Sequence, residues 1–413
     1  MIEEPYLLPI TIPCYFDADG RRCLDELWYK DLVEHLVHIR HLTLAAPAST
    51  DMPAGRMVPI DADSFDGGLR FVDLPAPRST AKALFTLPTL MARIWKEVGR
   101  ARIVHGNVAG WPIPLGWIAV PMAKLRGKFV LTNIESAPWR RGFERPWRPS
   151  PLLKAIVFES MVRLCVNISD IATFTHAGYM ESMLLRLRKA RGRVFNASWI
   201  DRKDIIAPTE AEDRWRAKLA DPRRPLRVVF AASLIPNKGV RVLLQALAEL
   251  ERRGSSVAVD VYGKGELADE CARASAALNG SVSLTMRGTV AYGTPFFEML
   301  DAYDVMVVPN LSDEQPRVVY DSFSRALPVI ASDNVGLVEC VTDGHNGKLV
   351  PPGDVGALAD AIAWAADHRP TLREWGINGL DKASALTHDQ MHARRAAFIM
   401  ESMKPRNEAI RAG

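Results

Sequence analysis

Residues 230–244 read FAASLIPNKGVRVLL and contain the end of a strand, a turn and the start of a helix. The strand, residues 226–231, ends in small side chains, and a proline turn then leads to Lys238 and Gly239. Small residues after a strand let backbone amides approach an anion, and a lysine near a helix start adds a positive charge. The segment therefore predicts a parallel α/β unit with an anion site at the end of its first strand. On its own it fits equally well an ordinary strand–turn–helix with a solvated lysine.

Short apolar strands alternate with longer helical patterns on both sides of this segment, as is typical of parallel sheets with crossover helices. In the second half the expected strands are 226–231, 257–262, 283–287, 305–308, 328–331 and 347–350, and the expected helices are 240–252, 265–278, 294–303, 317–325 and 355–366. In the first half the expected strands are 6–12, 42–46, 70–74, 102–106, 128–132, 171–175 and 193–196, and the expected helices are 25–38, 81–99 and 151–166.

A polar stretch with prolines, residues 202–225, separates the two series. We therefore predict an α/β fold of two doubly wound domains, residues 1–205 and 206–385, followed by a C-terminal helix within residues 386–413. In such sheets ligands sit at the carboxyl ends of the strands, which in a two-domain protein means the cleft between the domains.

Residues 308–332 read VPNLSDEQPRVVYDSFSRALPVIAS and place a second set of polar groups after a strand. Asp313 and Glu314 fall in a loop, Pro316 suits the first turn of a helix, and Asp321 falls inside that helix, where aspartate is a poor helix former. Paired carboxylates there could accept hydrogen bonds from sugar and ribose hydroxyls. For Glu314 a solvated carboxylate is an equally simple interpretation.

From residue 225 to about residue 370 the chain resembles the retaining glycosyltransferases of family 4, also called glycosyl transferases group 1, which have the GT-B fold. The landmarks, in chain order, are Lys238-Gly239, Tyr262-Gly263-Lys264-Gly265, Arg287-Gly288-Thr289-Val290, Asp313 with Asp321, PVIAS at 328–332, GLVE at 336–339 and DGHNGKLVPPGD at 343–354. The resemblance implies two Rossmann-like domains facing across a cleft, the second binding a nucleotide sugar and the first an acceptor. It also implies that the C-terminal helix crosses back to the first domain. Before residue 225 the resemblance is one of topology only.

The resemblance also implies roles for individual residues. Lys238 would hold the donor diphosphate, Asp313 would contact the sugar, Asp321 would grip the ribose, and Val290 would lie against the nucleotide base. The backbone amides at the start of the helix after Asp313 would meet sugar or phosphate. The remaining predicted donor-site residues are Ser233, Gly263, Arg317, Val318 and Val319.

This sequence departs from the family's pattern in two ways. Both family glutamates are aspartates here, so the side chains of Asp313 and Asp321 are one methylene shorter and should reach less far. Ser233 stands where the family usually has an arginine, although a serine-leucine also occurs in a subgroup. Arg317 or Arg241 could supply the missing cation. We favour Arg317 because it opens a helix beside the expected phosphate.

Candidate substrate residues follow or end strands of the first domain. His105 comes before Gly106 and Asn107 at one strand end, Glu135 ends the next, and His176 follows a third. In enzymes of this kind such residues often face the sugars, whereas the simpler reading of His105 is a histidine satisfied by backbone groups. Near the N-terminus FDADG, residues 16–20, stands in place of the family's usual paired glycines, which leaves the acceptor side open.

Residues 139–148, WRRGFERPWR, alternate tryptophan and arginine and are followed by Lys154 and an apolar run. This pattern is typical of an interfacial anchor or of a surface for a lipid pyrophosphate. A basic loop with packed aromatic rings is the alternative. The basic run 186–193 indicates a solvated helix end that would add to the same positive field.

The composition is that of an ordinary globular protein, with 413 residues, 48% hydrophobic and 24% charged. A net charge of +4 is too weak to indicate nucleic acid binding but suits an anionic substrate or a membrane surface. The five cysteines lack paired metal-ligand spacing, which favours a reducing compartment. There is no signal-peptide pattern and no uncharged apolar run of about 18 residues. We expect a cytoplasmic protein, with peripheral contact to the inner face of the membrane left open.

These observations predict transfer of a sugar, with retention, from a UDP- or GDP-linked donor to an acceptor hydroxyl. A lipid-linked or surface-polysaccharide saccharide is the expected acceptor. No cofactor or metal is expected, because no Asp-x-Asp motif stands at a strand end in the context of a metal site. Two alternatives remain at this point: a related enzyme that hydrolyses or epimerises a nucleotide sugar, and a non-catalytic GT-B-shaped subunit of an active transferase.

Overall fold

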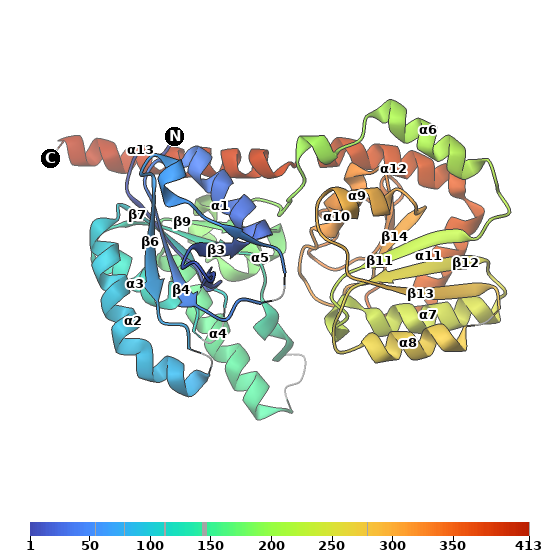
Figure 1. Ribbon diagram of the computed structural model, residues 1–413, viewed down its shortest axis with the longest axis horizontal. Coiled ribbons are helices and arrows are strands. Elements are labelled where there is room, and N and C mark those ends of the chain that lie inside the picture. The colour runs from blue at the N-terminus through green and yellow to red at the C-terminus, as the bar shows by residue number, and fades with distance from the viewer. Residues whose placement is uncertain (54, 78, 111–112, 143–146, 279, 413) are drawn as a thin grey trace. The chain divides into compact units, whose positions relative to one another are not determined.

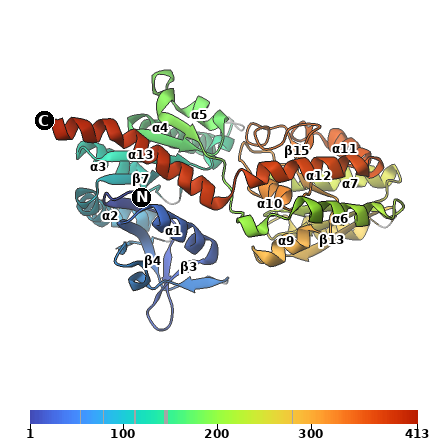
Figure 2. The same cartoon turned by 90° about the horizontal axis from the view of Figure 1, so that it is seen from above.

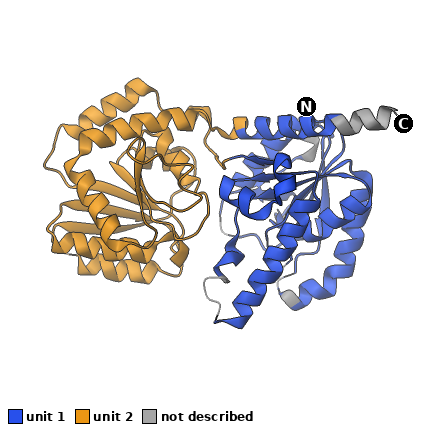
Figure 3. Ribbon diagram, turned by 180° about the vertical axis from the view of Figure 1, so that it is seen from behind, with its two compact units in different colours: residues 1–195, 391–413 blue, residues 196–390 orange. Residues whose placement is uncertain are grey.

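The computed structural model describes residues 1–412 except 54, 78, 111–112, 143–146 and 279 (Figure 1). The chain divides into two compact units (Figure 3). Unit 1 comprises residues 1–195 and 391–413, and unit 2 comprises residues 196–390. The sequence placed these boundaries at residues 205 and 385 instead. Both units have a predominantly parallel sheet with helices on both faces, as the alternating pattern predicted.

The elements of unit 1 are interrupted by short 3-10 turns. The strands are β1 Tyr6–Pro9, β2 Cys14–Phe16, β3 Arg22–Asp25, β4 Leu42–Ser49, β5 Met57–Pro59, β6 Leu69–Leu74, β7 Ile103–Asn107, β8 Phe129–Ile134, β9 Ile171–Phe174 and β10 Gly192–Val194. The helices are α1 Glu26–His38, α2 Thr80–Arg100, α3 Gly116–Leu125, α4 Pro149–Ile168, α5 Ala177–Met183 and α13 His388–Ala412, the last beginning in unit 2. The 3-10 turns include η2 Pro138–Gly142 and η3 Arg186–Arg191.

Unit 2 repeats the same alternation. Its strands are β11 Leu226–Ala231, β12 Val257–Tyr262, β13 Val282–Gly288, β14 Val305–Val308, β15 Val329–Ser332 and β16 Gly347–Val350. Its helices are α6 Pro208–Leu219, α7 Val240–Arg252, α8 Ala268–Ala277, α9 Thr294–Leu300, α10 Val318–Ser324, α11 Val355–Asp367 and α12 Arg369–Ser384, with a 3-10 turn η5 at Pro236–Lys238.

The strand orders reveal one topology in both units. In unit 2 the sheet runs β13-β12-β11-β14-β15-β16 with every neighbouring pair parallel. In unit 1 the parallel strands run β6-β4-β1-β7-β8-β9-β10. In each sheet the next strands along the chain therefore lie on one side of the first strand, β11 or β1, and the later strands lie on its other side. Ligands of open α/β sheets bind where this reversal occurs, at the carboxyl ends of the two strands on either side of it.

Each sheet of unit 1 and unit 2 is covered by apolar cores on both faces. In unit 1, α2, α3 and α4 pack on one face, while α1 and α13 pack on the other (Figure 2). In unit 2, α7, α8 and α11 contribute to one core and α9 and α10 to the other. The buried strands are almost wholly apolar, because a parallel strand covered on both faces meets no water.

The predicted elements differ from the structure in several details. The first strand ends at Pro9 and not at residue 12, and an antiparallel hairpin follows, in which β2 pairs with β3 and β3 with β5. The segment at residues 16–20 forms the turn of this hairpin, where Asp17 accepts hydrogen bonds from the Arg21 amide and guanidinium at 2.8 Å each. The helices α3, α5 and α12 also lie where the sequence predicted none.

Candidate donor-binding site and its surroundings

The point of strand reversal in unit 2 lies between β11 and β14. The chain leaves β11 through residues 232–239, and it leaves β14 through residues 309–317. Both loops start at the carboxyl edge of the sheet, because the two strands are parallel neighbours. The two stretches that stood out in the sequence therefore meet at the place where this type of sheet binds ligands.

An ion pair joins these two loops. Lys238 Nζ lies 2.8 Å from Glu314 Oε2, and both side chains are about four-fifths buried, with relative exposures of 20% and 21%. A largely buried charge pair of this kind keeps a cation at the end of β11 without leaving it uncompensated. The sequence left open whether Glu314 is a solvated carboxylate, and the structure shows it as the direct partner of Lys238.

Glycines set how closely the surrounding loops approach one another. Gly239 has φ +72°, and a Cβ there would collide with the carbonyl oxygen of Pro309. Gly263 has φ +152°, and a Cβ there would collide with the carbonyl oxygen of Ala232. The loops after β11, β12 and β14 are therefore packed backbone to backbone, which only glycine permits.

The predicted residues after β14 differ in exposure and in the groups they contact. Asp313 is exposed, and Arg317 caps the start of α10 with its guanidinium 4.1 Å from the ring centre of Trp199. Val318 is half-buried and Val319 is fully buried. The stacking on Trp199 gives Arg317 a fixed place beside α10.

Arg241, the alternative to Arg317 as the missing cation, is engaged elsewhere. Its guanidinium forms two hydrogen bonds with Glu270 on α8, at 2.8 Å and 2.6 Å. The pair lies on the surface between α7 and α8. The geometry therefore favours Arg317 over Arg241 as a group available at the end of β14.

Asp321 is buried in the first turn of α10, and it is held by a residue that the sequence did not single out. Tyr292 Oη donates a hydrogen bond to Asp321 Oδ1 at 2.8 Å. Burial, and then the charge of Asp321, raise the pKa of the Tyr292 hydroxyl, so Tyr292 stays a donor. Val290, two residues before Tyr292, is half-buried against the same apolar core. The loop predicted to cradle the base thus contacts the carboxylate predicted to grip the ribose.

Ser233 is exposed at the end of β11, and each of the two loops contains a buried asparagine, Asn237 after β11 and Asn310 after β14. Asn237 Oδ1 and Asn310 Nδ2 meet no hydrogen-bond partner among the described residues. Buried polar atoms without partners are uncommon in native folds, and they concentrate where a ligand or water completes the bonding. Neither asparagine was singled out from the sequence.

The DGHNG landmark is a braced turn. Asn346 Oδ1 accepts from the Thr342 amide at 2.8 Å, and Asp343 Oδ1 accepts from the Leu349 amide at 2.8 Å. The side chains of Asn346 and Asp343 thus accept hydrogen bonds from nearby backbone amides, which explains this motif by the local fold.

In unit 1 the three candidate substrate residues have different surroundings. His105 lies inside β7, is buried, and has Nδ1 3.0 Å from the hydroxyl of Tyr6. Burial lowers the pKa of His105 well below its usual value, so the ring is neutral. Glu135 is exposed just after β8, and it accepts a hydrogen bond from Asn133 Nδ2 at 2.9 Å. His176 is fully buried with its ring against Tyr179. Contact of these residues with substrate stays a prediction.

The Trp/Arg segment divides into a packed part and an exposed part. Trp139 is buried, and its indole nitrogen donates to Glu159 at 2.9 Å, as does Arg140. Trp147 is exposed. Residues 143–146, like Trp111 and Pro112 further back, lie outside the described residues. The first half of the segment is therefore a basic loop with a packed aromatic ring.

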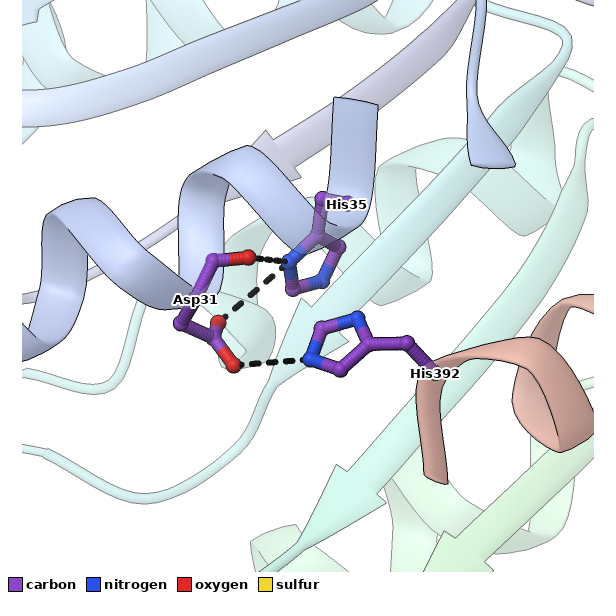
Figure 4. A group of neighbouring side chains, drawn as sticks. All are labelled: Asp31, His35 and His392. Carbon is purple, nitrogen blue, oxygen red and sulfur yellow. Dashed lines mark hydrogen bonds and ion pairs between the residues drawn. The ribbon is translucent and has the colours of Figure 1, made fainter. Parts of the chain in front are cut away.

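A buried polar cluster joins α1 to α13 (Figure 4). Asp31 Oδ1 lies 3.0 Å from His392 Nε2, and the Asp31 carbonyl oxygen lies 2.8 Å from His35 Nδ1. Arg395 Nη2 lies 3.0 Å from His35 Nε2 and 2.9 Å from His392 Nδ1. In the ranges that the structure describes, Asp31, His35 and His392 form the group whose ligand atoms are spaced closely enough for a metal ion.

The hydrogen bonds of this cluster do not fit a metal site. A guanidinium can only donate, so His35 Nε2 and His392 Nδ1 must accept, and the protons then lie on the two nitrogens that face Asp31. Those are the nitrogens that a metal would need unprotonated. Burial lowers the pKa of His392 well below its usual value, which agrees with a neutral ring. The cluster is thus a closed hydrogen-bond network that holds α13 on α1.

Comparison with known proteins agrees with this geometry. Residues 225–368 match the family model described as glycosyl transferases group 1. A GDP-mannose-dependent alpha-(1-6)-phosphatidylinositol monomannoside mannosyltransferase of Mycolicibacterium smegmatis is 29% identical over 409 residues, covering 96% of this chain and 98% of that protein. With two other curated relatives, the alignment spans only 41% and 47% of the relative's length.

Solved structures resemble the whole chain at low sequence identity. Sucrose-phosphate synthase from Thermosynechococcus elongatus superposes with a TM-score of 0.68 and 18% identity, covering 100% of both chains. HepE from Anabaena, crystallised in complex with UDP, superposes with a TM-score of 0.64 and 14% identity, covering 96% of this chain and 100% of HepE.

The two Rossmann-like sheets and these structural neighbours define the fold class as GT-B. The match over residues 225–368, which contains Lys238, Glu314 and Asp321, makes the second unit similar to the glycosyl transferases group 1.

Proposed function

We propose that this chain transfers a sugar from a nucleoside-diphosphate sugar to an acceptor hydroxyl, with retention and without a metal ion. The observation that carries the proposal is the ion pair between Lys238 and Glu314 at the point of strand reversal. It brings a cation to the place where a Rossmann-like sheet binds phosphate. The name of the GDP-mannose-dependent relative, and the UDP of HepE, support a nucleotide-sugar donor.

In the proposed reaction the bond between the sugar's anomeric carbon and the diphosphate oxygen breaks, and a bond to the acceptor oxygen forms. The acceptor's proton passes to the departing diphosphate. Lys238 stabilises the negative charge that develops on that group, and Arg317 adds a second positive charge from the start of α10. Glu314 holds Lys238 in place before the donor binds.

The remaining donor contacts follow from the positions already described. Asp321, held by Tyr292, accepts from the ribose, and Val290 lies against the base. Asp313 is exposed and meets the sugar. The backbone amides of Val318 and Val319 meet the sugar or phosphate, and Ser233 and Gly263 line the approach from β11 and β12. His105 and Glu135 are proposed to face the acceptor.

A lipid-linked or surface-polysaccharide saccharide is the proposed acceptor. The Mycolicibacterium relative is named for a phosphatidylinositol mannoside acceptor, and a mild positive charge suits an anionic membrane. No helix in the described part of the chain is long and apolar enough to cross a membrane. The five cysteines are buried thiols, which suits the reducing cytoplasm, so any membrane contact is proposed to be peripheral on its inner face.

Thermal unfolding in the presence of UDP, GDP, ADP and CMP tests the donor site. A ligand at about 100 times its dissociation constant adds about 2.7 kcal/mol to the free energy of unfolding. One nucleotide diphosphate should raise the melting temperature selectively. The rise should be lost in Lys238→Ala and kept in Arg252→Ala, a control that removes an exposed cation from α7 of the same unit.

Turnover with the nucleotide sugar so identified is the second measurement. Lys238→Ala should lower turnover about 100-fold or more, since one preorganised donor lowers the activation barrier by about 3–4 kcal/mol. Wild-type turnover in this variant would refute the assignment of Lys238 to the phosphate. No stabilisation by any nucleotide would instead indicate a chain that does not bind a donor by itself.

A further inference from the structure

Helix α2 has two apolar faces, and only one of them is covered. Ala83, Leu90 and Ile94 are buried against the sheet of unit 1. A second set of apolar side chains on the same helix is exposed, and Phe85 is 89% exposed. Spacings of three and four residues place this second set along one stripe of the helix. The exposed stripe consists of Leu84, Phe85, Pro88, Met91 and Trp95.

Helix α4 repeats the arrangement. Ala155, Val162 and Val166 are buried, the two valines in the core of unit 1. A second set of apolar side chains, spaced by three, four and eleven residues from Leu153, is exposed. Leu153 itself is 63% exposed. The exposed stripe of α4 consists of Leu153, Ile156, Val157 and Leu164.

The two stripes belong to one helix layer. α3 packs against both α2 and α4, and the three helices cover the same face of the sheet (Figures 1 and 2). Trp117, Ile118 and Met122 of α3 are only partly buried, so this helix also leaves some apolar surface uncovered. Soluble proteins rarely leave apolar side chains grouped in this way unless the surface meets a partner. We call this surface the α2–α4 face.

The charged side chains on the stretches of α2 and α4 that carry the apolar stripes are all positive. Lys82, Arg93 and Lys96 of α2 and Lys154 of α4 are exposed cations. The chain contains no Asp or Glu between residues 74 and 96, or between residues 147 and 158. A surface that is apolar and flanked only by cations along these stretches is complementary to anionic lipid headgroups above a hydrocarbon layer.

The first acidic residue of each helix is neutralised by arginine. Glu97 is buried and lies 3.0 Å from Arg100. Glu159 lies 2.9 Å from both Arg140 and Arg163. Neither carboxylate therefore presents an uncompensated negative charge to a membrane.

One cation is already placed as it would be at a lipid interface. The Arg126 guanidinium lies 3.9 Å from the ring centre of Trp95, at the end of the α2 stripe. Tryptophan rings prefer the level of the headgroups, and arginine can keep its charge there while its stem covers apolar surface.

We propose that the α2–α4 face binds the surface of an anionic lipid bilayer. The α2–α4 face would be the membrane contact of the proposed transferase. Its purpose rests on the proposed function, because a lipid-linked acceptor would be reached at the membrane. The surface differs from the Trp/Arg segment chosen from the sequence, in which Trp139 is buried. A protein partner would be expected to carry acidic groups, and a second copy of this face would bring like charges together.

Vesicle sedimentation of the full chain tests the proposal, with phosphatidylcholine vesicles that either contain or lack phosphatidylglycerol. The wild type should bind the anionic vesicles and bind neutral ones much less. Replacing Phe85 and Ile156 together by serine should weaken partition at least about tenfold. Lys82→Gln and Lys154→Gln should each weaken it about fivefold. Val37→Ser with Met400→Ser, two exposed apolar changes on α1 and α13, should leave it unchanged.

Other outcomes separate this proposal from its rivals and from the proposed function. Equal loss in the control pair, or binding that is insensitive to Phe85 and Ile156, would refute the α2–α4 face as the docking surface. A change in oligomeric state with no vesicle binding would assign the face to a second copy of the chain. Vesicle binding without sugar transfer would refute the proposed function alone, and transfer to a water-soluble acceptor without vesicle binding would refute this inference alone.

Discussion

The two units have the same order of core strands but carry charge in different places. In unit 2 the strand reversal between β11 and β14 holds the Lys238–Glu314 pair. In unit 1 the corresponding reversal lies between β1 and β7, where Gly110 closely approaches Thr11. The polar cluster of unit 1 lies instead under α1 and α13, away from the strand ends. The topology is therefore the same in both units, and the proposal that the sheet of unit 2 binds a phosphate rests on the charges at its reversal more than on the fold.

The largest loss of stability is expected in unit 2, where the loops after β11 and β14 pack backbone to backbone at Gly239. Gly239→Ala should lower the free energy of unfolding by about 3 kcal/mol or more, because φ is +72° and the new Cβ meets the Pro309 carbonyl. Gly254→Ala is the matched control in the same unit, since Gly254 has φ +71° and open space around it. It should cost only about 1 kcal/mol. Urea unfolding measures both, and equal losses would show that the loop approach at Gly239 is not tightly fixed.

The difference between the units also explains what the sequence could predict. In unit 2, the predicted bounds of β11, β12, β14 and β16 agree with the structure. The clearest case is β14, which is buried throughout and reads as a continuous apolar run. The hairpin of β2 and β3 was missed, since each strand is only three or four residues long and the turn between them resembles a loop.

The polar sites show the same limit. Lys238 and the carboxylates after β14 could be found because each stands in a local motif. The partnership of Lys238 with Glu314 could not, because neighbouring loop residues point in different directions and the sequence does not say which one meets the lysine. His392 contacts Asp31 across 361 positions of sequence, so no local pattern links them.

The polar cluster of unit 1 gives the next largest effect. Asp31→Ala removes the acceptor of His392 Nε2–H, and with it the carboxylate of a buried cluster in which Arg395 contacts His392. We expect a loss of about 3 kcal/mol in the free energy of unfolding. Glu3→Ala, which breaks an exposed pair with Arg40 in the same unit, should cost less than about 1 kcal/mol. A gain in stability on adding Zn²⁺ to the wild type would contradict the metal-free interpretation.

Acid should weaken unit 1 through the same cluster. Burial, and then Arg395, keep the pKa of His392 well below 6.5 in the folded state. The unfolded chain, with a pKa of about 6.5, therefore takes up a proton that the folded unit does not. The contribution of His392 to the free energy of unfolding is fully present above pH 6.5. Below that pH it falls by up to about 1.4 kcal/mol per pH unit.

Urea unfolding of wild type and His392→Gln over this pH range tests the assignment. Glutamine keeps a neutral donor toward Asp31 but does not titrate, so the variant's stability should depend less steeply on pH. His105, Tyr6, His35, Asp31 and Arg395 face the same space, and His105 has a pKa lowered by burial as well. Some dependence should therefore remain in the variant. An unchanged slope would exclude His392 as a contributor.

The smallest effect separates the two arginines of unit 2. Arg317→Ala should weaken binding of the nucleotide diphosphate about tenfold, the value of one charge-assisted hydrogen bond, because its guanidinium is held over Trp199 beside α10. Arg241→Ala removes an equal charge from the surface pair with Glu270 and should leave binding unchanged. Calorimetric titration of both variants decides between them. Because both changes remove one positive charge from the same unit, equal weakening would mean that the general field of unit 2 attracts the donor, and the role given to the strand reversal would then rest on Lys238 alone.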